Sequence, residues 1–383
     1  MMRHVCIVSN TLADGGAERW ASNTCTYLAG QHDLIVSLIL FRNEQSYPCP
    51  DSVKVRVIDH RYFVHTFRTV RQLRRMILRD QVDVVISNGA FTGQFVGQAI
   101  RGTNARWIAR ISGNIAKGQR NILQRLGWCW LDRNIQRATA IVANSANLTR
   151  EARTRWPGLI ERAVTIPNGV DIPHLISALT QPKEWRETER PPRPILLAAG
   201  RLHSQKRPDI FLHTVRILQN SFDFEAYWCG DGPLRDETER LVIEMGLEGC
   251  VRIIGFRSDL PAWMRRAACF VMTSDHEGSP NVLAEAMAIG VPVVTTNCDH
   301  GPGELLADGR GWLAPVGDSA KIAAAIAEVL SNPDEAQRRA SKAQRWVQEN
   351  LDLKSIGACW KKLIDDCLQS QPQQGKSPAG RTA

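Results

Sequence analysis

Four charged side chains in the second half of the sequence have the types and spacing to bind one ligand. Glu277 lies in a polar turn that contains glycine and proline, and Glu285 follows eight positions later. Arg201 and Lys206 share an earlier loop. Carboxylates accept hydrogen bonds from hydroxyl groups, whereas the arginine fork and the mobile lysine ammonium suit the oxygens of a diphosphate. The set favours an anionic ligand that is rich in hydroxyl groups.

A strand, a turn and a helix must position the two glutamates. The apolar run 269–273 predicts a buried strand, and a segment that can form a helix begins at about Asn281 and ends near Ala288. The first amides of a helix have no partner within the helix, and they attract oxyanions. We therefore expect the backbone of 278–281 to face oxygen atoms of the ligand.

Each half of this set also has a simpler interpretation. Two glutamates at this spacing can belong to a capped surface helix whose acids face solvent. An arginine and a lysine near a strand end are, taken alone, ordinary surface charges. The surrounding sequence favours a site, because Glu277-Gly-Ser-Pro-Asn-Val-Leu-Ala-Glu285-Ala-Met-Ala-Ile-Gly-Val-Pro-Val-Val resembles the signature of retaining glycosyltransferases of family 4. Arg201 and Lys206 match that family's pattern of a Gly-Arg followed by a Lys.

The resemblance implies a fold and a reaction. The fold is α/β, with two Rossmann-like doubly wound domains that face each other across a cleft, the GT-B architecture. The reaction is the retaining transfer of a hexosyl or N-acetylhexosaminyl unit from a nucleoside diphosphate sugar to a glycan or lipid-linked acceptor, in polysaccharide, lipopolysaccharide or other glycoconjugate biosynthesis. Attack would come from the same face of the sugar, and the leaving phosphate would take the proton.

The resemblance also implies roles for individual residues. The expected catalytic residues are Arg201 and Lys206, which would stabilise the leaving diphosphate, and Glu277, which would bind the transferred sugar. Glu285 would bind the ribose. The other expected donor contacts are Asp231, Phe256, Arg257, Gly278, Ser279, Pro280, Asn281 and Val282.

A glycine-rich turn near the N-terminus is the corresponding feature of the first half. Gly15 and Gly16 follow the apolar strand 5–10 and precede a helix, a geometry that binds anions, although a plain tight turn explains the pair equally well. The sequence Gly-Gly-Ala-Glu-Arg again resembles family 4, in which this loop faces the cleft. The expected acceptor contacts are Gly15, Gly16, Glu18, Asn88 and Arg110. Many relatives carry a histidine near Arg110, so no role that depends on histidine is carried over.

The apolar runs define the domains. Runs rich in β-formers recur at 34–41, 53–58, 82–87, 107–111, 140–143 and 164–166, and several are separated by segments that can form helices, which predicts a mostly parallel sheet. We expect an N-terminal domain over 1–177, a linker over 178–194, and a C-terminal nucleotide-sugar domain over 195–350. A helix over 351–368 would pack back on the first domain, and 369–383 would be disordered.

The charge of the chain is uneven. The net charge is +9, and residues 1–180 hold 23 Lys and Arg against 12 Asp and Glu. Two helical segments, 65–80 and 117–137, carry much of this surplus, and they suit either an anionic membrane surface or a solvated helix face. A basic nucleic-acid-binding protein would explain this half alone. A nucleotide-sugar epimerase or hydrolase of similar fold is the alternative enzyme.

Cofactor and compartment follow from what the sequence does and does not contain. It has no Asp-x-Asp motif, so we expect no metal and no other cofactor. The ten cysteines are scattered singly, which favours reduced thiols. No apolar run has the length of a membrane span, and the first strand starts without a signal-peptide core. The expected location is cytoplasmic, extending to the cytoplasmic face of the inner membrane, and nucleic acid is not an expected partner.

Overall fold

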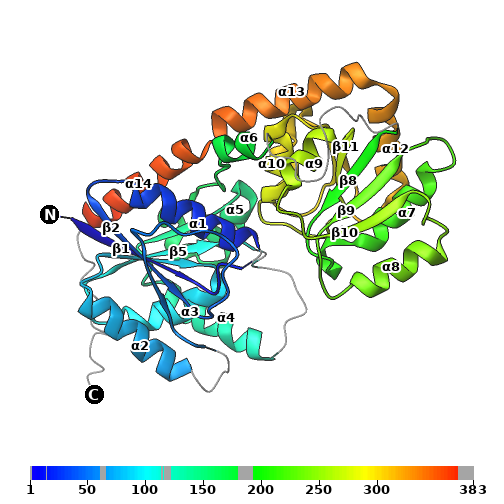
Figure 1. Ribbon diagram of the computed structural model, residues 1–383. Coiled ribbons are helices and arrows are strands. Elements are labelled where there is room, and N and C mark those ends of the chain that lie inside the picture. Colours follow the sequence, from blue (N-terminus) through cyan, green and yellow to red (C-terminus); the bar gives the residue numbers. More distant parts are fainter. Residues whose placement is uncertain are drawn as a thin grey trace.

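The structure, a computed structural model, describes residues 2–13, 15–60, 66–113, 115, 122–179 and 193–369, with 122–124 described by their backbone alone. Two α/β domains lie next to each other, and helices cross from one to the other (Figure 1). The predicted linker over 178–194 and tail over 369–383 lie largely outside the described residues.

The first domain is built on a parallel sheet of seven strands in the order β3-β2-β1-β4-β5-β6-β7. Its central strands are runs of Val, Ile and Leu, as is usual for parallel strands that are covered on both faces. The strands are β1 (Arg3–Ser9), β2 (Leu34–Leu40), β3 (Lys54–Val57), β4 (Val84–Asn88), β5 (Arg106–Ile111), β6 (Ala140–Ala143) and β7 (Ala163–Thr165).

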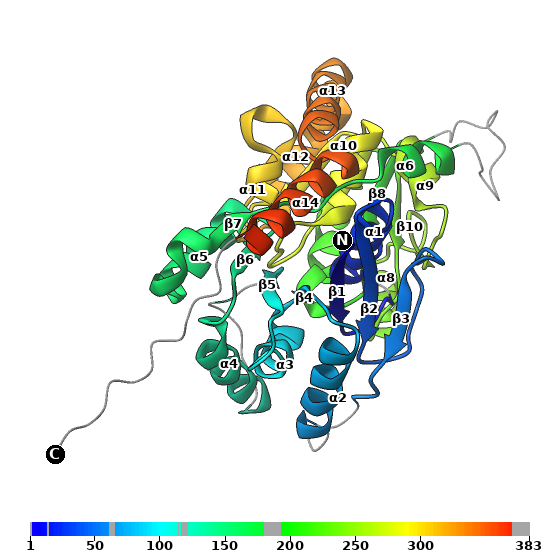
Figure 2. The ribbon, with the colours of Figure 1, turned by 90° about the vertical axis from the view of Figure 1, so that its left-hand side faces the viewer.

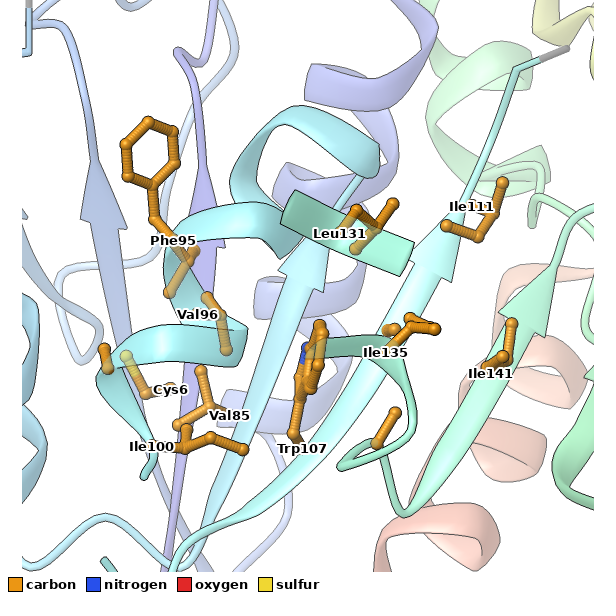
Figure 3. Packing of buried hydrophobic residues seen from close by; sticks show 14 of the residues in the cluster. Cys6, Val85, Phe95, Val96, Ile100, Trp107, Ile111, Leu131, Ile135 and Ile141 are labelled. Carbon is orange, nitrogen blue, oxygen red and sulfur yellow. The ribbon is translucent and has the colours of Figure 1, made fainter. Parts of the chain in front are cut away.

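Helices cover both faces of this sheet. One face packs on α2 (Thr66–Arg79), α3 (Ala90–Ala99), α4 (Ile122–Ile135) and α5 (Ala146–Arg155). Figure 3 shows Trp107 of β5 in this layer, with side chains from α3 and α4 around it. The other face packs on α1 (Gly16–Ala29). Successive β1 residues alternate between the two layers, as the period of a strand requires.

The second domain repeats this plan with six parallel strands in the order β10-β9-β8-β11-β12-β13. The strands are β8 (Ile195–Ala199), β9 (Glu225–Cys229), β10 (Val251–Gly255), β11 (Cys269–Met272), β12 (Val293–Thr296) and β13 (Trp312–Ala314). One face packs on α7 (Pro208–Leu218), α8 (Arg235–Glu244) and α12 (Ser319–Ser331), and the other on α9 (Leu260–Arg266), α10 (Asn281–Ile289), α11 (Pro302–Leu305) and α13 (Pro333–Asn350). The predicted fold, two doubly wound α/β domains, is confirmed.

The chain passes between the domains at two adjacent points. Val170 N donates to Leu351 O at 2.7 Å, and Leu353 N donates to Val170 O at 3.0 Å. Beyond this crossing, α14 (Leu353–Gln369) packs on the first domain beside α1 (Figures 1 and 2), and its Trp360 ring lies 5.0 Å from that of Trp20. The last helix, α14, therefore follows the second domain in the chain but packs on the first domain.

One boundary differs from the expectation. The sequence analysis places residues up to 177 in the first domain, but α6 (Ile172–Leu179) packs on α9 and α10 of the second. Leu175 belongs to the second domain's core, because after the crossing this short helix packs its apolar side on α9 and α10. The described residues also contain the short 3-10 segments η2 (Pro157–Arg162), η3 (Ser204–Lys206) and η4 (Ala307–Gly309).

Candidate active site

Both sheets reverse their strand order beside a central strand, between β1 and β4 in the first domain and between β8 and β11 in the second. In doubly wound sheets, ligands bind beyond the carboxyl ends of the strands at these switch points. Gly15 and Gly16 follow β1, whereas Arg201 and Lys206 follow β8 and Glu277 follows β11. The predicted donor and acceptor residues thus occupy equivalent places in the two domains.

Lys206 and Glu277 are in contact. The Lys206 ammonium forms an ion pair with Glu277 Oε1, which also accepts a hydrogen bond from Ser274 Oγ at 2.7 Å. The two loops that carry them are tied together, since Gln205 Nε2 donates to His276 O at 2.8 Å. Asp275 N in turn donates to Gln205 O at 2.9 Å. Both charges are therefore fixed by backbone contacts and not by the ion pair alone.

Glu285 lies in the body of α10, and its carboxylate meets the first domain. Its exposed fraction is 6%, and burial raises the pKa of its carboxyl group above the usual value. Arg19, from the first turn of α1, forms an ion pair with Glu285 Oε1 and opposes that rise. The Glu285 carboxylate, which we expect from the sequence to bind the ribose, thus forms an ion pair with the other domain.

Arg201 and Glu18 lie near each other across the boundary between the domains. Arg201 is exposed, and among the residues that the structure describes it forms no ion pair. Burial raises the pKa of Glu18, while the positive charges of Arg201 and Arg110 act in the opposite direction. Glu18 folds back over its own loop, because a Cβ on Gly15 would lie 2.3 Å from its Oε2.

The amino end of α10 touches the first domain through backbone and amide groups. The first hydrogen bond of the helix runs from Leu283 N to Pro280 O at 3.2 Å, so the amides of Asn281 and Val282 precede it. Asn281 Nδ2 donates to Gly16 O at 3.1 Å. Gly278 is required for this approach, since a Cβ there would lie 2.3 Å from Ser112 O.

Ser279 and Asn281 are held by one asparagine of the first domain. Asn168 Nδ2 donates to Asn281 Oδ1 at 2.7 Å and lies 3.2 Å from Ser279 O. The oxygen of the same amide accepts from Arg110 at 2.8 Å. One side chain therefore connects the core of the first domain to the helix entrance of the second.

Arg110 and Asn88 are buried and bonded to each other. Arg110 is 1% exposed, its NH1 donates to Asn88 Oδ1 at 2.7 Å, and its guanidinium stacks 4.2 Å from the ring centroid of Trp20. Burial lowers the pKa of Arg110 to about 9, with the Glu18 carboxylate acting in the opposite direction. Asn88 Nδ2 donates to Ser9 Oγ at 3.0 Å and Ala17 O at 2.8 Å. The structure places these two expected acceptor contacts inside the domain.

The three remaining expected donor contacts lie at the ends of β9 and β10. Asp231 accepts from Gly232 N at 2.8 Å and pairs with Arg235 at 2.9 Å, and these bonds lower its pKa. Arg257 forms a bidentate pair with Asp259, both bonds at 2.8 Å. Phe256 is 67% exposed and could stack on a planar ring.

Two sequence models of glycosyltransferases match the chain. The model described as glycosyl transferases group 1 matches residues 193–332, and that described as glycosyltransferase family 4 matches residues 14–173. The chain belongs to the group 1 glycosyltransferases. The two matches together span parts of both domains and contain every expected donor and acceptor residue.

Individual relatives of this glycosyltransferase share part of its length. The lipopolysaccharide core biosynthesis glycosyltransferase LpsE of Rhizobium meliloti is 27% identical over 172 residues, which are 45% of this chain and 49% of that protein. The amylovoran biosynthesis glycosyltransferase AmsK of Erwinia amylovora is 32% identical over 140 residues, 34% of each chain. The chain thus spans about half, or less, of the length of these curated relatives.

Solved structures share the GT-B fold over almost the whole chain. A glycosyltransferase of Rickettsia africae superposes with a TM-score of 0.78 at 15% identity, covering 97% of this chain and 100% of that one. Anabaena HepE in complex with UDP superposes with a TM-score of 0.77 at 20% identity, covering 95% of this chain and 100% of that one.

Several contacts of this glycosyltransferase were not expected from its sequence. Arg19 stands in the Gly-Gly-Ala-Glu-Arg sequence, yet nothing there indicates a partner in the other domain. The same holds for Asn168 and for Glu304, whose carboxylate accepts hydrogen bonds from Ala146 N at 2.9 Å and Asn147 N at 2.8 Å, at the start of α5. The sequence of the turn 301–305 indicates a helix entrance and no contact with the other domain.

Two further features of the described residues concern metal binding and membrane insertion. Among the described residues, no group of three or more His, Cys, Asp or Glu side chains is placed to hold a metal ion. In the same part of the chain, no helix combines the length and apolar character needed to cross a membrane. The ten cysteines are free thiols.

Proposed function

We propose that this protein is a retaining glycosyltransferase. It moves a hexosyl or N-acetylhexosaminyl unit from a nucleoside diphosphate sugar to a glycan or lipid-linked saccharide in polysaccharide or lipopolysaccharide biosynthesis. The observation that carries the proposal is the contact of Lys206 with Glu277 at the second switch point, with the exposed Arg201 in the same loop as Lys206. The two loops thus bring two cations and one carboxylate to the same strand ends, beside a helix entrance, a combination that suits a sugar diphosphate.

The names of relatives and neighbours support the same reaction. LpsE is a lipopolysaccharide core biosynthesis glycosyltransferase, and AmsK is an amylovoran biosynthesis glycosyltransferase. HepE was crystallised with UDP and, separately, with UDP-glucose. A uridine nucleotide is accordingly the first probe to use here.

In the proposed reaction, the bond between the anomeric carbon and the leaving phosphate oxygen breaks. The acceptor hydroxyl oxygen bonds to the same face of that carbon, and its proton passes to the leaving phosphate. Arg201 and Lys206 stabilise the negative charge that develops on the diphosphate. Glu277 accepts a hydrogen bond from the transferred sugar and Glu285 one from the ribose, which must share Glu285 with Arg19 or displace it.

Two measurements test this function. A panel of nucleoside diphosphate sugars is screened by thermal shift, because a bound donor raises the unfolding temperature by mass action. The anomeric configuration of the product is then read by NMR, with retention expected. Turnover of donor that no acceptor accelerates would instead identify an epimerase or hydrolase, and binding to duplex DNA with no response to any donor would identify a nucleic-acid-binding protein.

We further propose that the first domain contacts an anionic membrane at the cytoplasmic face of the inner membrane. Arg68, Arg71 and Arg75 are exposed on α2, where their spacing places them on one face. Phe67 of the same helix is 80% exposed and contacts Trp130 of α4, with ring centroids 6.4 Å apart. Arginines beside exposed aromatic rings suit headgroups of anionic lipid.

The membrane proposal is tested with vesicles. Sedimentation with phosphatidylserine vesicles should fall when the three arginines are replaced by Gln, each contributing about 1 kcal/mol, and should fall with salt. Arg240→Gln, on an exposed face of α8, is the control and should sediment like the wild type. Equal binding to neutral and anionic vesicles would contradict the proposal.

A further inference from the structure

Two cysteines of the first domain lie on the same side of its sheet. Cys25 belongs to α1 and is buried, whereas Cys49 belongs to the segment 44–50, between β2 and β3, and is half-buried. Both side chains pack on the apolar cluster between α1 and the sheet. Neither thiol takes part in the proposed transfer of a sugar. The pair therefore offers a second chemistry to this domain.

A hydrogen bond holds the segment 44–50 on the face of α1 that carries Cys25. Ser22 Oγ, one helical turn before Cys25, donates to Pro48 O at 2.6 Å. Residues three positions apart in a helix are neighbours on its surface, and Cys49 directly follows Pro48 in the chain. The two thiols are thereby brought to the same place on α1.

The two thiols interact, and the interaction makes them chemically unequal. A hydrogen bond from the Cys25 thiol lowers the pKa of the Cys49 thiol, while burial acts in the opposite direction. Hydrogen bonding to Cys49 and burial raise the pKa of the Cys25 thiol well above its usual value. The thiolate is the reactive form of cysteine, and it needs access to its reagent. Cys49 thus has the character of an attacking thiol, and Cys25 can react only with its neighbour.

We propose that Cys49 and Cys25 form a redox modification site for a low-molecular-weight disulfide of the glutathione class. The Cys49 thiolate attacks one sulfur of that disulfide, which forms a mixed disulfide and releases one small thiolate. Cys25 then gives its proton to the released thiolate and attacks Cys49 Sγ, and the second small thiolate leaves. The protein loses two electrons and two protons, which convert one small disulfide into two thiols. Exchange in the reverse direction restores the free cysteines.

The segment that carries Cys49 also contacts a residue of the candidate active site. The Arg19 guanidinium lies 5.6 Å from the centroid of the Tyr47 ring. Arg19 in turn pairs with Glu285, which the donor's ribose must share with Arg19 or free from it. While the cysteines are free, the segment 44–50 can shift with Arg19 and keep the contact with its ring. The disulfide ties the segment to α1, so an Arg19 that leaves Glu285 loses that contact.

Oxidation of the pair should therefore weaken donor binding. This consequence rests on the proposed function, because it needs the ribose at Glu285, whereas the disulfide itself does not. The expected loss of UDP affinity is about two- to fivefold, the range for one exposed cation–π contact.

Mass spectrometry of the full chain tests the disulfide. The protein is equilibrated with oxidised glutathione, free thiols are blocked with N-ethylmaleimide, and peptide mapping locates each disulfide. We expect a Cys25–Cys49 disulfide that dithiothreitol removes. Cys25→Ala should instead retain glutathione on Cys49, because the resolving thiol is missing. Cys359→Ser removes an exposed thiol of α14, so it is the matched control and should form the same disulfide as the wild type.

A wild type that forms no Cys25–Cys49 disulfide would overturn the proposal, and this measurement needs no variant. Cys25→Ala without glutathione on Cys49 would show that Cys49 is not the attacking thiol.

Calorimetry with UDP tests the consequence for donor binding. Oxidised wild type should bind UDP about two- to fivefold more weakly than reduced wild type, and the oxidant should not change the affinity of Cys49→Ser. Equal affinity of the two wild-type states would refute the link through Tyr47 alone. A wild type that binds neither UDP nor any nucleotide sugar in either state would refute the proposed function, and the peptide map would still decide whether the disulfide forms.

Discussion

The two sheets of this glycosyltransferase place polar residues at the same topological position and use them differently. At the switch point of the first sheet, Asn88 and Arg110 are buried and bonded to each other. At the switch point of the second, Arg201 is exposed, and the Lys206–Glu277 pair lies in loops that ligand atoms can approach. Topology therefore locates candidate sites, but the exposure of each side chain decides which of them a ligand can reach.

The difference has a structural consequence at the domain boundary. Arg110 bonds to Asn168, and Asn168 bonds to Asn281 at the entrance of α10. The first switch point thus holds the donor loop of the second domain in place. In this arrangement, residues of the first sheet hold the donor loop in position. The loops after the second sheet carry the charged side chains proposed to bind the donor.

The largest effect that tests this comparison is expected from Arg110→Ala. The change leaves Asn88 Oδ1 and Asn168 Oδ1 without their donor, and each unsatisfied buried group costs about 1 to 3 kcal/mol. The free energy of unfolding from urea titration should fall by about 2 to 5 kcal/mol. Arg75→Ala, on the exposed face of α2, should change it by no more than about 0.5 kcal/mol. If Arg110→Ala matched Arg75→Ala in stability but lost transfer, the first switch point would be a ligand site after all.

Lys206→Ala and Arg201→Ala should affect ligand binding instead. Each should weaken UDP binding by about 1.5 to 3 kcal/mol, the range for hydrogen bonds to charged groups, with the protein still folded. Calorimetry gives the affinity, and a urea titration gives the stability. Arg240→Ala is the matched control, because it removes an exposed cation far from the switch point. If both site variants bound UDP with wild-type affinity, the second switch point would not be the ligand site, and the proposed difference between the two sheets would be wrong.

Much of this architecture could be predicted from the apolar pattern. The run 82–87 corresponds to β4 and the run 140–143 to β6, because a strand buried on both faces must be apolar throughout. The donor residues could also be recognised, since Glu277 and Glu285 lie within one short stretch of distinctive sequence. Local pattern was sufficient wherever the interacting groups are close in the chain.

The contacts between domains could not be predicted in this way. Arg19 and Glu285 are 266 positions apart, and Asn168 and Asn281 are 113 apart. Whether Arg110 faces a ligand or the core depends on Trp20 and on helix α14 behind it, whose register no local pattern specifies. The same is true of His300 and Glu151, which meet only when both domains are folded and in contact.

A smaller effect concerns Glu285, the charge through which the second sheet meets the first domain. Burial raises its pKa in the native state, so the native protein holds this proton more tightly than the unfolded chain. Its favourable contribution is complete below the ordinary pKa of glutamate, and it is lost as the pH rises through the raised value. Relative to Glu285→Gln, the wild type should therefore lose stability over this range by at most about 1.4 kcal/mol per pH unit, the limit for one proton.

Urea titrations of both proteins at several pH values measure this difference. Glu18, whose pKa burial also raises, is present in both proteins and cancels in the comparison. A wild type that instead gained stability relative to Glu285→Gln with rising pH would show that Arg19 outweighs burial. The Arg19–Glu285 contact would then be a stabilising ion pair. It would not be a buried charge whose desolvation cost is offset when the donor's ribose binds.

The smallest expected effect is that of a chelator on donor turnover. At the second switch point, Arg201 and Lys206 supply two positive charges next to the proposed diphosphate position, and cationic side chains can stabilise a leaving diphosphate as a metal ion does. Glu277 is already paired with Lys206 and with Ser274, so this carboxylate is engaged before the donor arrives. Turnover of the donor in excess EDTA should therefore equal that in buffer within error. Turnover that is lost in EDTA and restored by magnesium or manganese would contradict this prediction. It would show that Arg201 and Lys206 cannot stabilise the leaving diphosphate without a metal ion.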